Sequence, residues 1–417
     1  MRKAGTGATG SRSRLGGNFH LLLAGNGVSV LGSSVYLLVI VLHLKQTTGS
    51  AAVLGLYNFI ALLPPVILGP FAGALIDRWS LKQVLVLSDA ARGLFMIILA
   101  GLAILPGGIG IVPLLLLTAL AGICHAFFMP AVQSIIPEIE PPYLLKRANS
   151  ARAAVSQLSN VAGNALGGLL YSLFGLVPIL LANGMSFILS AIQESFIQIP
   201  PRAKKVPRKT ILTETLEGFG YLRQKKGLGT LVLANAMVFL FSPPLMLALP
   251  FVIEDTLGLP TPMVGVAFAI MLGGGIGAYL LWGTMSLSRL ADYRILTGSF
   301  FLLSVAVFLS GMFLRPVVLL GTLFFAGGAI ASIHLMISTT VQRTVESHKR
   351  ARVFALVEAA GALSAPFAYL ASGFLVDLVL QEVTLVFLVS SAFIAMAGTL
   401  AIRSSGLRQL FDHGSQE

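Results

Sequence analysis

The chain has 417 residues, of which 56% are hydrophobic and only 11% charged, and its formal net charge is +12. A soluble domain carries about 25% charged residues, and a globule of this size cannot hide so many apolar side chains from water. This composition excludes a soluble enzyme, a secreted domain and a disordered protein, and it predicts a chain that lies mostly in a lipid bilayer.

Twelve apolar stretches are long enough to cross a bilayer as helices, which takes about 20 residues. In chain order they cover residues 18–42, 51–76, 83–105, 111–135, 149–172, 175–198, 229–251, 263–287, 294–314, 316–341, 353–377 and 383–402. The longest break divides them six plus six. We therefore expect an all-α membrane protein with a tail over 1–17, a six-helix bundle over 18–199, a linker over 200–228, a second bundle over 229–403 and a tail over 404–417.

The end of the linker predicts a short amphipathic helix at the membrane interface, because Leu212, Leu216, Phe219 and Leu222 would share one face. A plain tether is the alternative. No charged n-region, apolar h-region and cleavage site precede the first span, so we expect no removable signal sequence. The single cysteine, Cys124, excludes a disulfide framework and a multi-cysteine metal site.

The positive charges predict the orientation of the chain. All but three of the 28 lysines and arginines fall on the side that holds both tails and the linker, while Lys45 and Arg315 lie opposite and Arg92 lies inside a span. Basic loops stay in the cytoplasm, so both termini are expected there. Because the surplus charge follows the loops, it marks topology and does not indicate a nucleic-acid partner.

The two halves of the chain repeat each other. His125 and Gln133 in the fourth span match His334 and Gln342 in the tenth at one offset of 209 residues. Three glycine pairs align at similar offsets: Gly168 with Gly373, Gly55 with Gly265, and Gly73 with Gly283. Chance similarity between glycine-rich helices is the alternative. Parallel repeats of this kind place a binding site between the halves, near the midplane of the membrane.

The loop between the second and third spans, Gly73-Ala-Leu-Ile-Asp77-Arg78-Trp-Ser80-Leu81-Lys82, resembles the signature loop of the major facilitator superfamily, with Ser80 and Leu81 in place of the usual Gly and Arg. Four further segments resemble the bacterial branch of macrolide-efflux proteins and the enterobactin exporter: Asn18-Phe-His-Leu-Leu, Thr48-Gly-Ser50, Ser88-Asp89-Ala-Ala-Arg92 and Leu249-Pro250-Phe-Val. The resemblance covers residues 15–405. It implies two six-helix bundles, a bacterial inner-membrane location and a gate formed by Gly73, Asp77, Arg78 and Lys82. Asp77 would bond to the start of the eleventh span, although Arg78 and Lys82 serve equally as topology signals.

The fifth span contains Gly163-Asn164-Ala-Leu-Gly167-Gly168, which resembles the antiporter motif of drug exporters with Asn164 in place of proline. Small residues at this spacing let helices approach closely. We therefore expect Gly163, Gly167 and Gly168 to serve helix packing.

Ionisable residues inside spans are costly and are therefore candidates for coupling transport to an ion. Glu358, about two turns into the eleventh span, is the leading candidate, with a pair to Arg352 as the alternative. Asp89 and Arg92 have the spacing of a structural ion pair or of a proton relay. Glu194 and Asp377 lie near helix ends, where we expect both to reach water.

His125 and His334 can change charge near neutral pH. They either face each other across a central cavity or bond neutrally to their neighbours. Two histidines without further ligands make a poor zinc site, so no metal is expected.

Neutral polar residues recur along one face of the first and fifth spans and occur singly in others. With one methionine, they form the predicted lining of the substrate cavity: Asn26, Ser33, Tyr36, Asn58, Met129, Gln157, Asn160, Asn164, Asn235 and Ser338. Hydrogen bonding between helices, at about 0.6 kcal/mol per pair, is the alternative. A lining rich in Met and Phe with few charges suits a bulky, amphipathic small molecule.

The chain has no Gly-x-x-x-x-Gly-Lys-Ser/Thr phosphate loop, so an ion gradient must supply the energy. We expect a secondary active transporter that exports a drug, macrolide or siderophore by alternating access. It is expected to work as a monomer without a cofactor. The resemblance implies proton antiport. An importer or a flippase for lipid-like substrates is the alternative. A polytopic membrane enzyme is disfavoured because the loops are too short to build a catalytic site.

Overall fold

The computed structural model describes residues 15–76, 79–199, 227–285, 288–345, 347–378 and 383–412. The long helices are α1 (Gly17–Thr48), α2 (Ala51–Ile76), α3 (Leu81–Ile104), α4 (Ile111–Ile139), α5 (Leu145–Phe174), α6 (Leu176–Ser195), α8 (Leu228–Phe241), α10 (Pro262–Thr284), α11 (Arg289–Met312), α12 (Pro316–Thr344), α13 (Ser347–Leu378) and α14 (Val383–Arg403). Among the described residues there are also four short elements: η1 (Pro142–Leu144), α9 (Pro243–Phe251), η2 (Val252–Thr256) and α15 (Ser405–Asp412). The amphipathic helix expected in the linker lies outside the described residues.

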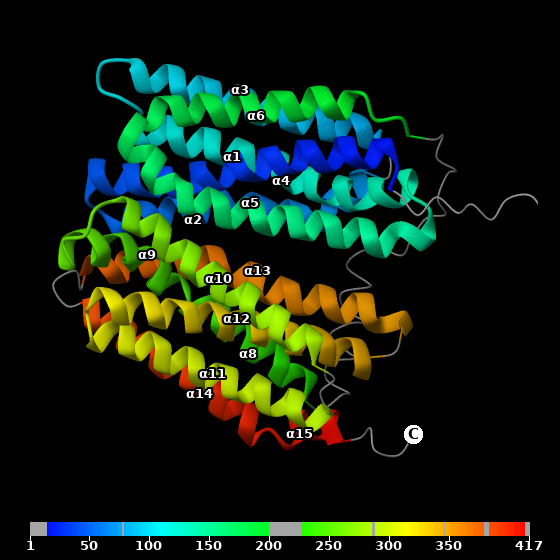
Figure 1. Ribbon diagram of the computed structural model, residues 1–417, viewed down its shortest axis with the longest axis vertical. Helices are drawn as coiled ribbons and strands as arrows, with labels where there is room; N and C mark the ends of the chain where they lie inside the picture. The colour runs from blue at the N-terminus through cyan, green and yellow to red at the C-terminus, as the bar shows by residue number, and fades with distance from the viewer. Residues whose placement is uncertain are drawn as a thin grey trace, which may run out of the picture.

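Figure 1 shows two bundles side by side, the first made of α1 to α6 and the second of α8 to α15. In the first bundle α3 packs against α6, α1 packs against α5 and α6, and α2 packs against α4. In the second bundle α12 packs against α10 and α11, α11 also packs against α14, and α13 packs against α8. The bundles meet where α2 contacts α13 and where α5 contacts α10.

The two ends of the bundles are named here by the termini. The tail side is the end at which α1 begins, at Gly17, and α14 ends, at Arg403. The far side is the opposite end, which contains Thr48 of α1 and Val383 of α14. The tail side lies on the right in Figure 1 and the far side on the left.

Eleven helical segments of the described chain are long and apolar enough to cross a membrane. Helix α5 is not among them, although it is 30 residues long and packs beside α1 and α10. Its polar side chains form hydrogen bonds with α1: Ser34 of α1 donates to Asn160 Oδ1 at 2.6 Å, and Ser156 of α5 donates to Asn26 Oδ1 at 3.3 Å. The polar face of α5 therefore lies against protein and does not face lipid.

The seventh span, expected as one helix over 229–251, is broken at Ser242, where α8 ends and α9 begins. Pro243 and Pro244 follow directly, and neither has an N–H to continue the ladder of helical hydrogen bonds. The chain then closes with the wider π-type turn η2, in which the Leu257 N–H bonds to the Val252 carbonyl at 2.9 Å. This irregular segment carries Glu254 and Asp255 to the far side.

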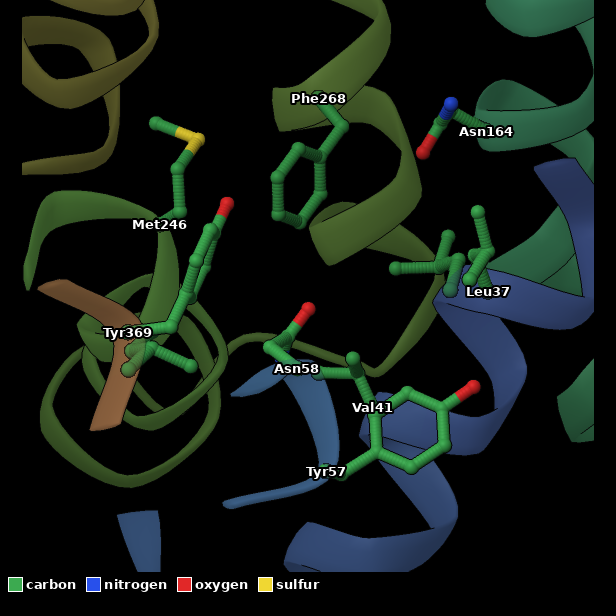
Figure 2. A pocket seen from close by; sticks show the side chains of 10 residues that line it. Leu37, Val41, Tyr57, Asn58, Asn164, Met246, Phe268 and Tyr369 are labelled. Carbon is green, nitrogen blue, oxygen red and sulfur yellow. The ribbon is translucent and has the colours of Figure 1, made fainter. Parts of the chain in front are cut away.

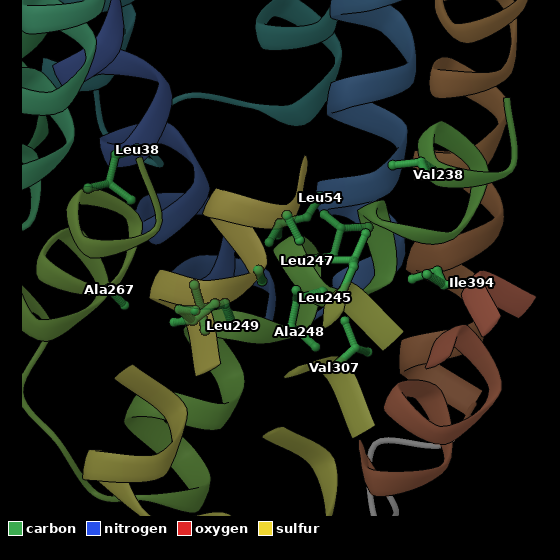
Figure 3. Packing of buried hydrophobic residues seen from close by; sticks show 14 of the residues in the cluster. Leu38, Leu54, Val238, Leu245, Leu247, Ala248, Leu249, Ala267, Val307 and Ile394 are labelled. Carbon is green, nitrogen blue, oxygen red and sulfur yellow. The ribbon is translucent and has the colours of Figure 1, made fainter. Parts of the chain in front are cut away.

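The larger hydrophobic core is shared by the two bundles, as Figure 3 shows. It contains Leu38 and Leu54 of the first bundle together with Leu247 and Ala267 of the second. A second cluster of buried apolar residues lies towards the tail side and belongs to the first bundle alone: Phe19, Leu22, Ala72, Ile76, Leu81, Val84, Leu85, Phe128, Ala131, Val132, Ile135, Ile136, Ala148 and Ile197. Within the described residues, the apolar contact between the bundles therefore lies away from the tail side.

The C-terminal tail contains a helix that the sequence analysis did not predict, α15. Leu407 and Phe411 are buried on its inner face, and the Phe411 ring lies 5.5 Å from the ring of Tyr293. Leu407, Leu410 and Phe411 follow the spacing of one helical face, so the sequence contained a signal for this helix.

Candidate functional site between the two bundles

Two glycine crossings bring the bundles into backbone contact. At the first crossing α2 meets α13, where a Cβ on Gly55 would lie 2.5 Å from the Tyr369 carbonyl oxygen and one on Gly373 would lie 2.5 Å from the Ala51 carbonyl oxygen. Any larger residue would push the two helices apart. Small residues allow this kind of close helix packing in membranes.

The second crossing joins α5 to α10. A Cβ on Gly265 would lie 2.5 Å from the Asn164 carbonyl oxygen, and one on Gly168 would lie 3.1 Å from the Thr261 carbonyl oxygen. These four glycines form two of the three pairs that the internal repeat aligned, Gly55 with Gly265 and Gly168 with Gly373. The two crossings are therefore equivalent positions of the two halves.

A buried ion pair also joins the bundles at the far side. Lys45 of α1, only 7% exposed, donates to Glu254 Oε2 at 2.6 Å and to Asp255 Oδ1 at 2.7 Å. Its ammonium group lies 5.3 Å from the centre of the Phe251 ring. Lys45 and Glu254 are 209 residues apart, the offset that relates the two halves. The pair thus connects equivalent ends of the first and seventh spans.

Asp377, at the far-side end of α13, caps the N-terminus of α2 in the other bundle. Its Oδ1 accepts from the Ala51 N–H at 2.6 Å, and its Oδ2 accepts from the Ser50 hydroxyl at 2.6 Å and the Ala52 N–H at 2.9 Å. A carboxylate at this position satisfies free N–H groups and interacts favourably with the helix dipole. Asp377 is half-buried, so it reaches water as expected, but the sequence analysis did not predict that it caps a helix of the other bundle.

A cavity of about 170 Å³ lies between the bundles and is lined by residues of both. Asn58 of α2 and Asn164 of α5 contribute amides, and Met246, Phe268 and Tyr369 contribute an apolar and aromatic wall. Figure 2 shows these side chains around one space. Each amide nitrogen donates to the backbone carbonyl four residues earlier, at 2.8 Å, so the amide oxygens remain as acceptors.

Comparison with known proteins identifies the family. Residues 22–369 match the profile of the Major Facilitator Superfamily. The chain belongs to the Major Facilitator Superfamily. It is therefore a membrane transporter that crosses the bilayer several times.

Relatives of this superfamily member include named efflux proteins. Macrolide efflux protein A of Streptococcus pyogenes is 26% identical over 303 residues, which cover 70% of this chain and 73% of that protein. The multidrug efflux pump Tap of Mycolicibacterium fortuitum is 27% identical over 403 residues, covering 93% and 94%. Among solved structures, a mutant form of the nucleoside transporter NupG superposes with a TM-score of 0.75 at 13% identity, over 93% of this chain and all of that one. That structure supports the shared fold alone.

In this superfamily member, two of the ten residues predicted to line the cavity do so, Asn58 and Asn164. Others use their polar groups within one bundle. Asn26 and Asn160 accept from α5 and α1 respectively, Tyr36 accepts from the Tyr57 hydroxyl at 3.3 Å, and Asn235 donates to the Val357 carbonyl at 3.3 Å. Ser33, Met129, Gln157 and Ser338 are half-buried and lie outside this cavity.

The glycines of the antiporter-like motif face different helices. A Cβ on Gly163 would lie 2.5 Å from Ser34 Cβ, and one on Gly167 would lie 3.0 Å from Leu38 Cδ2, so both pack on α1. Gly168 instead contacts the other bundle at Thr261 and Pro262.

The structure does not describe the environment of several predicted gating and coupling residues. Asp77 and Arg78 lie outside the described residues, and the structure describes the helices of Gly73 and Glu358 but not the surroundings of these two residues. Lys82 is half-buried in the first turn of α3. The roles assigned to these residues stay predictions.

The remaining titratable candidates lie within single bundles. Asp89 and Arg92 form an ion pair on α3, as their spacing indicated. The side chain of His125 is exposed on α4, and the His334 ring stands edge-on to Phe239 of α8, with 5.3 Å between ring centres.

Proposed function

We propose that this chain is a secondary active exporter that moves a bulky, amphipathic small molecule, such as a macrolide, another drug or a siderophore, in exchange for protons. The substrate would bind between the bundles, and the bundles would rock to open the cavity to one side of the membrane at a time. The termini would lie in the cytoplasm of a bacterial cell, so the far side would face outwards.

The observation that carries this proposal is the cavity between the bundles together with the seal on its far side. The seal consists of two glycine crossings, one lysine with two carboxylates and one helix cap, all of which join one bundle to the other. Contacts of this kind separate without unfolding either bundle. Such a seal suits a transporter that must open on that side once in each cycle.

The chemistry of the cavity supports the substrate class. Its described lining includes no charged side chain and combines Met, Phe, Tyr and Leu with two amide oxygens. This lining fits an apolar molecule with N–H or O–H donors and disfavours a small anion such as phosphate, which would require a buried cation. The names of the relatives, macrolide efflux protein A and the multidrug efflux pump Tap, agree with this class.

The proposal can be tested in inside-out membrane vesicles from cells that lack their own main drug pumps. Respiration acidifies the vesicle interior, and quenching of quinacrine fluorescence reports the proton gradient. Addition of erythromycin or ethidium should partly restore the fluorescence, because an exporter in this orientation carries the compound inwards as protons leave.

Vesicles with the Gly373→Leu variant are the control, since that change should block closure of the far side. Proton-coupled export of these compounds is rejected if neither erythromycin nor ethidium restores fluorescence in vesicles that contain the unaltered chain at the same level.

A further inference from the structure

A second cluster of buried charges lies inside the first bundle, where α3 packs against α6 (Figure 1). Asp89 of α3 and Glu194 of α6 are both fully buried, and Arg92 of α3 is nearly so. The expectation that Glu194 reaches water was wrong, although Glu194 is the second-last residue of its helix. None of these three residues lines the cavity between the bundles.

The cluster contains two carboxylates and one guanidinium. Arg92 donates to Asp89 Oδ1, whereas Asp89 Oδ2 and both carboxyl oxygens of Glu194 have no hydrogen-bond partner among the described atoms. The guanidinium of Arg92 also lies 4.3 Å from the centre of the Phe128 ring and 4.5 Å from that of Phe187. Two aromatic rings therefore cover part of the Arg92 guanidinium.

This imbalance of charge requires compensation. If both carboxyl groups were ionised, one negative charge would remain buried without a partner, which is strongly destabilising. A single proton on one carboxyl group removes that cost and turns the group into a hydrogen-bond donor. Asp89 already has Arg92 as its partner, which leaves Glu194 as the carboxyl group to which the proton would bind.

The helices packed around the cluster carry few other titratable groups. The charges of Asp89 and Arg92 act on Glu194, and the charge of Arg92 also acts on His125 and Cys124 of α4. Helix α1, which packs against α6, has no titratable side chain between His20 and Tyr36. Helix α5 adds two arginines in its first turns, Arg147 and Arg152.

The cluster is also sealed by close packing. A Cβ on Gly93 would lie 2.9 Å from the Gly184 carbonyl oxygen, where α3 crosses α6. A Cβ on Gly25 of α1 would lie 2.9 Å from Ser190 Oγ, one turn before Glu194. Helix α1 also contributes Leu37, Leu38 and Val41 to the cavity. One helix therefore contacts both the charge cluster and the candidate substrate site.

We propose that Glu194 is the proton-binding residue of the transport cycle, with Asp89 and Arg92 as its buried electrostatic partners. This inference rests on the proposed function and names its coupling site. Glu194 holds a proton while α1, α3 and α6 are packed as observed, and it exchanges the proton when movement of α1 opens the cluster to water. Proton and substrate then occupy different sites, so they are linked through α1 and do not compete for the same groups.

Infrared spectroscopy of the purified protein in lipid nanodiscs tests the protonated state directly. At neutral pH we expect the carbonyl-stretch band of a protonated carboxyl group, and its shift in D2O should be slow because the site is buried. The band should be lost in Glu194→Gln and kept in Glu194→Asp. Asp292→Asn is the matched control, since buried Asp292 has Arg343 as its own cation. Absence of the band in the unaltered protein, or its survival in Glu194→Gln, would overturn the assignment.

Transport by reconstituted vesicles tests the coupling. Glu194→Gln, which should elute as a single species in size-exclusion chromatography, is expected to lose ethidium accumulation driven by a pH gradient but to retain exchange of labelled for unlabelled ethidium. Accumulation equal to that of the unaltered protein, or accumulation driven by a sodium gradient at constant pH, would overturn the coupling role.

The two proposals fail separately. The infrared result does not depend on any substrate, so it decides the proton site even if ethidium is not carried. Conversely, proton-driven transport by the unaltered protein that persists in Glu194→Gln would keep the proposed function and reject Glu194.

Discussion

The ion pair of Lys45 with Glu254 and Asp255 offers the sharpest test of the far-side seal. Replacement by Lys45→Gln removes the buried cation and leaves two neighbouring carboxylates without compensation. When the far side opens, water hydrates all three groups, so the change raises the free energy of the closed state selectively. The population that is open on the far side should therefore increase.

The size of this effect follows from the burial of the groups. Breaking a fully buried ion pair costs about 3–5 kcal/mol, whereas an exposed pair contributes about 0–1 kcal/mol. Lys45 and Glu254 are 7% and 13% exposed, but Asp255 is 59% exposed and is largely screened by solvent. We therefore expect a shift of about 2 kcal/mol, or about thirtyfold in the ratio of the two states.

Spin labels on the far side can measure this shift. Thr47 and Thr256 are exposed, and they lie near the ends of α1 and η2. In a Cys124→Ser background, Thr47→Cys with Thr256→Cys provides a labelled pair for double electron–electron resonance. Lys45→Gln should transfer population from the short to the long distance.

Two control variants separate charge from packing. Lys45→Arg should keep the short distance, and the reversed pair, Lys45→Glu with Glu254→Lys, should restore it. A distance distribution in Lys45→Gln that matches the unaltered protein would refute the idea that this ion pair holds the far side closed.

Further changes test the rest of the site. Gly373→Leu should leave only the long spin-label distance, because its Cβ would lie 2.5 Å from the Ala51 carbonyl oxygen. The control Gly298→Ala should behave as the unaltered protein, because no atom lies within 4 Å of its Cβ. Equal distances in the two variants would show that the glycine crossing does not hold the far side closed. Asp377→Asn should destabilise the closed state by about 1 kcal/mol, which changes the ratio of closed to open populations about fivefold. An unchanged ratio would show that the Asp377 cap does not stabilise the closed state. Asn58→Leu should raise the half-saturating erythromycin concentration about fivefold through loss of one hydrogen bond worth about 1 kcal/mol. An unchanged value would place erythromycin elsewhere.

The polar stripes illustrate how far sequence reasoning reached. Asn58 and Asn164 were expected in the cavity and line it, whereas Asn26 and Asn160 bond between α1 and α5. The period of a stripe shows that one face of a helix avoids lipid. It does not show whether that face meets another helix or a cavity, because both environments select the same residue types.

The far-side residues show the same limit. Lys45 and Asp377 could be assigned to helix ends, but nothing local indicated that one reaches Glu254 or that the other caps α2. Glu194 was expected to reach water because it is near the end of α6, yet α6 and its neighbours bury it. These outcomes depend on how helices distant in the chain cross.

The sequence by itself determined the membrane environment, the positions of the spans, the six-plus-six division and the pairs of glycines that correspond in the two halves. These properties follow from the hydropathy, charge and spacing of neighbouring residues, which act within one helix. Only the tertiary structure decided that the matched glycines meet across the bundles, that Lys45 reaches Glu254 and that Glu194 is buried where α6 packs against α3. Those features are set by packing between helices, where a distance of a few ångströms separates a hydrogen bond from a solvent-exposed charge.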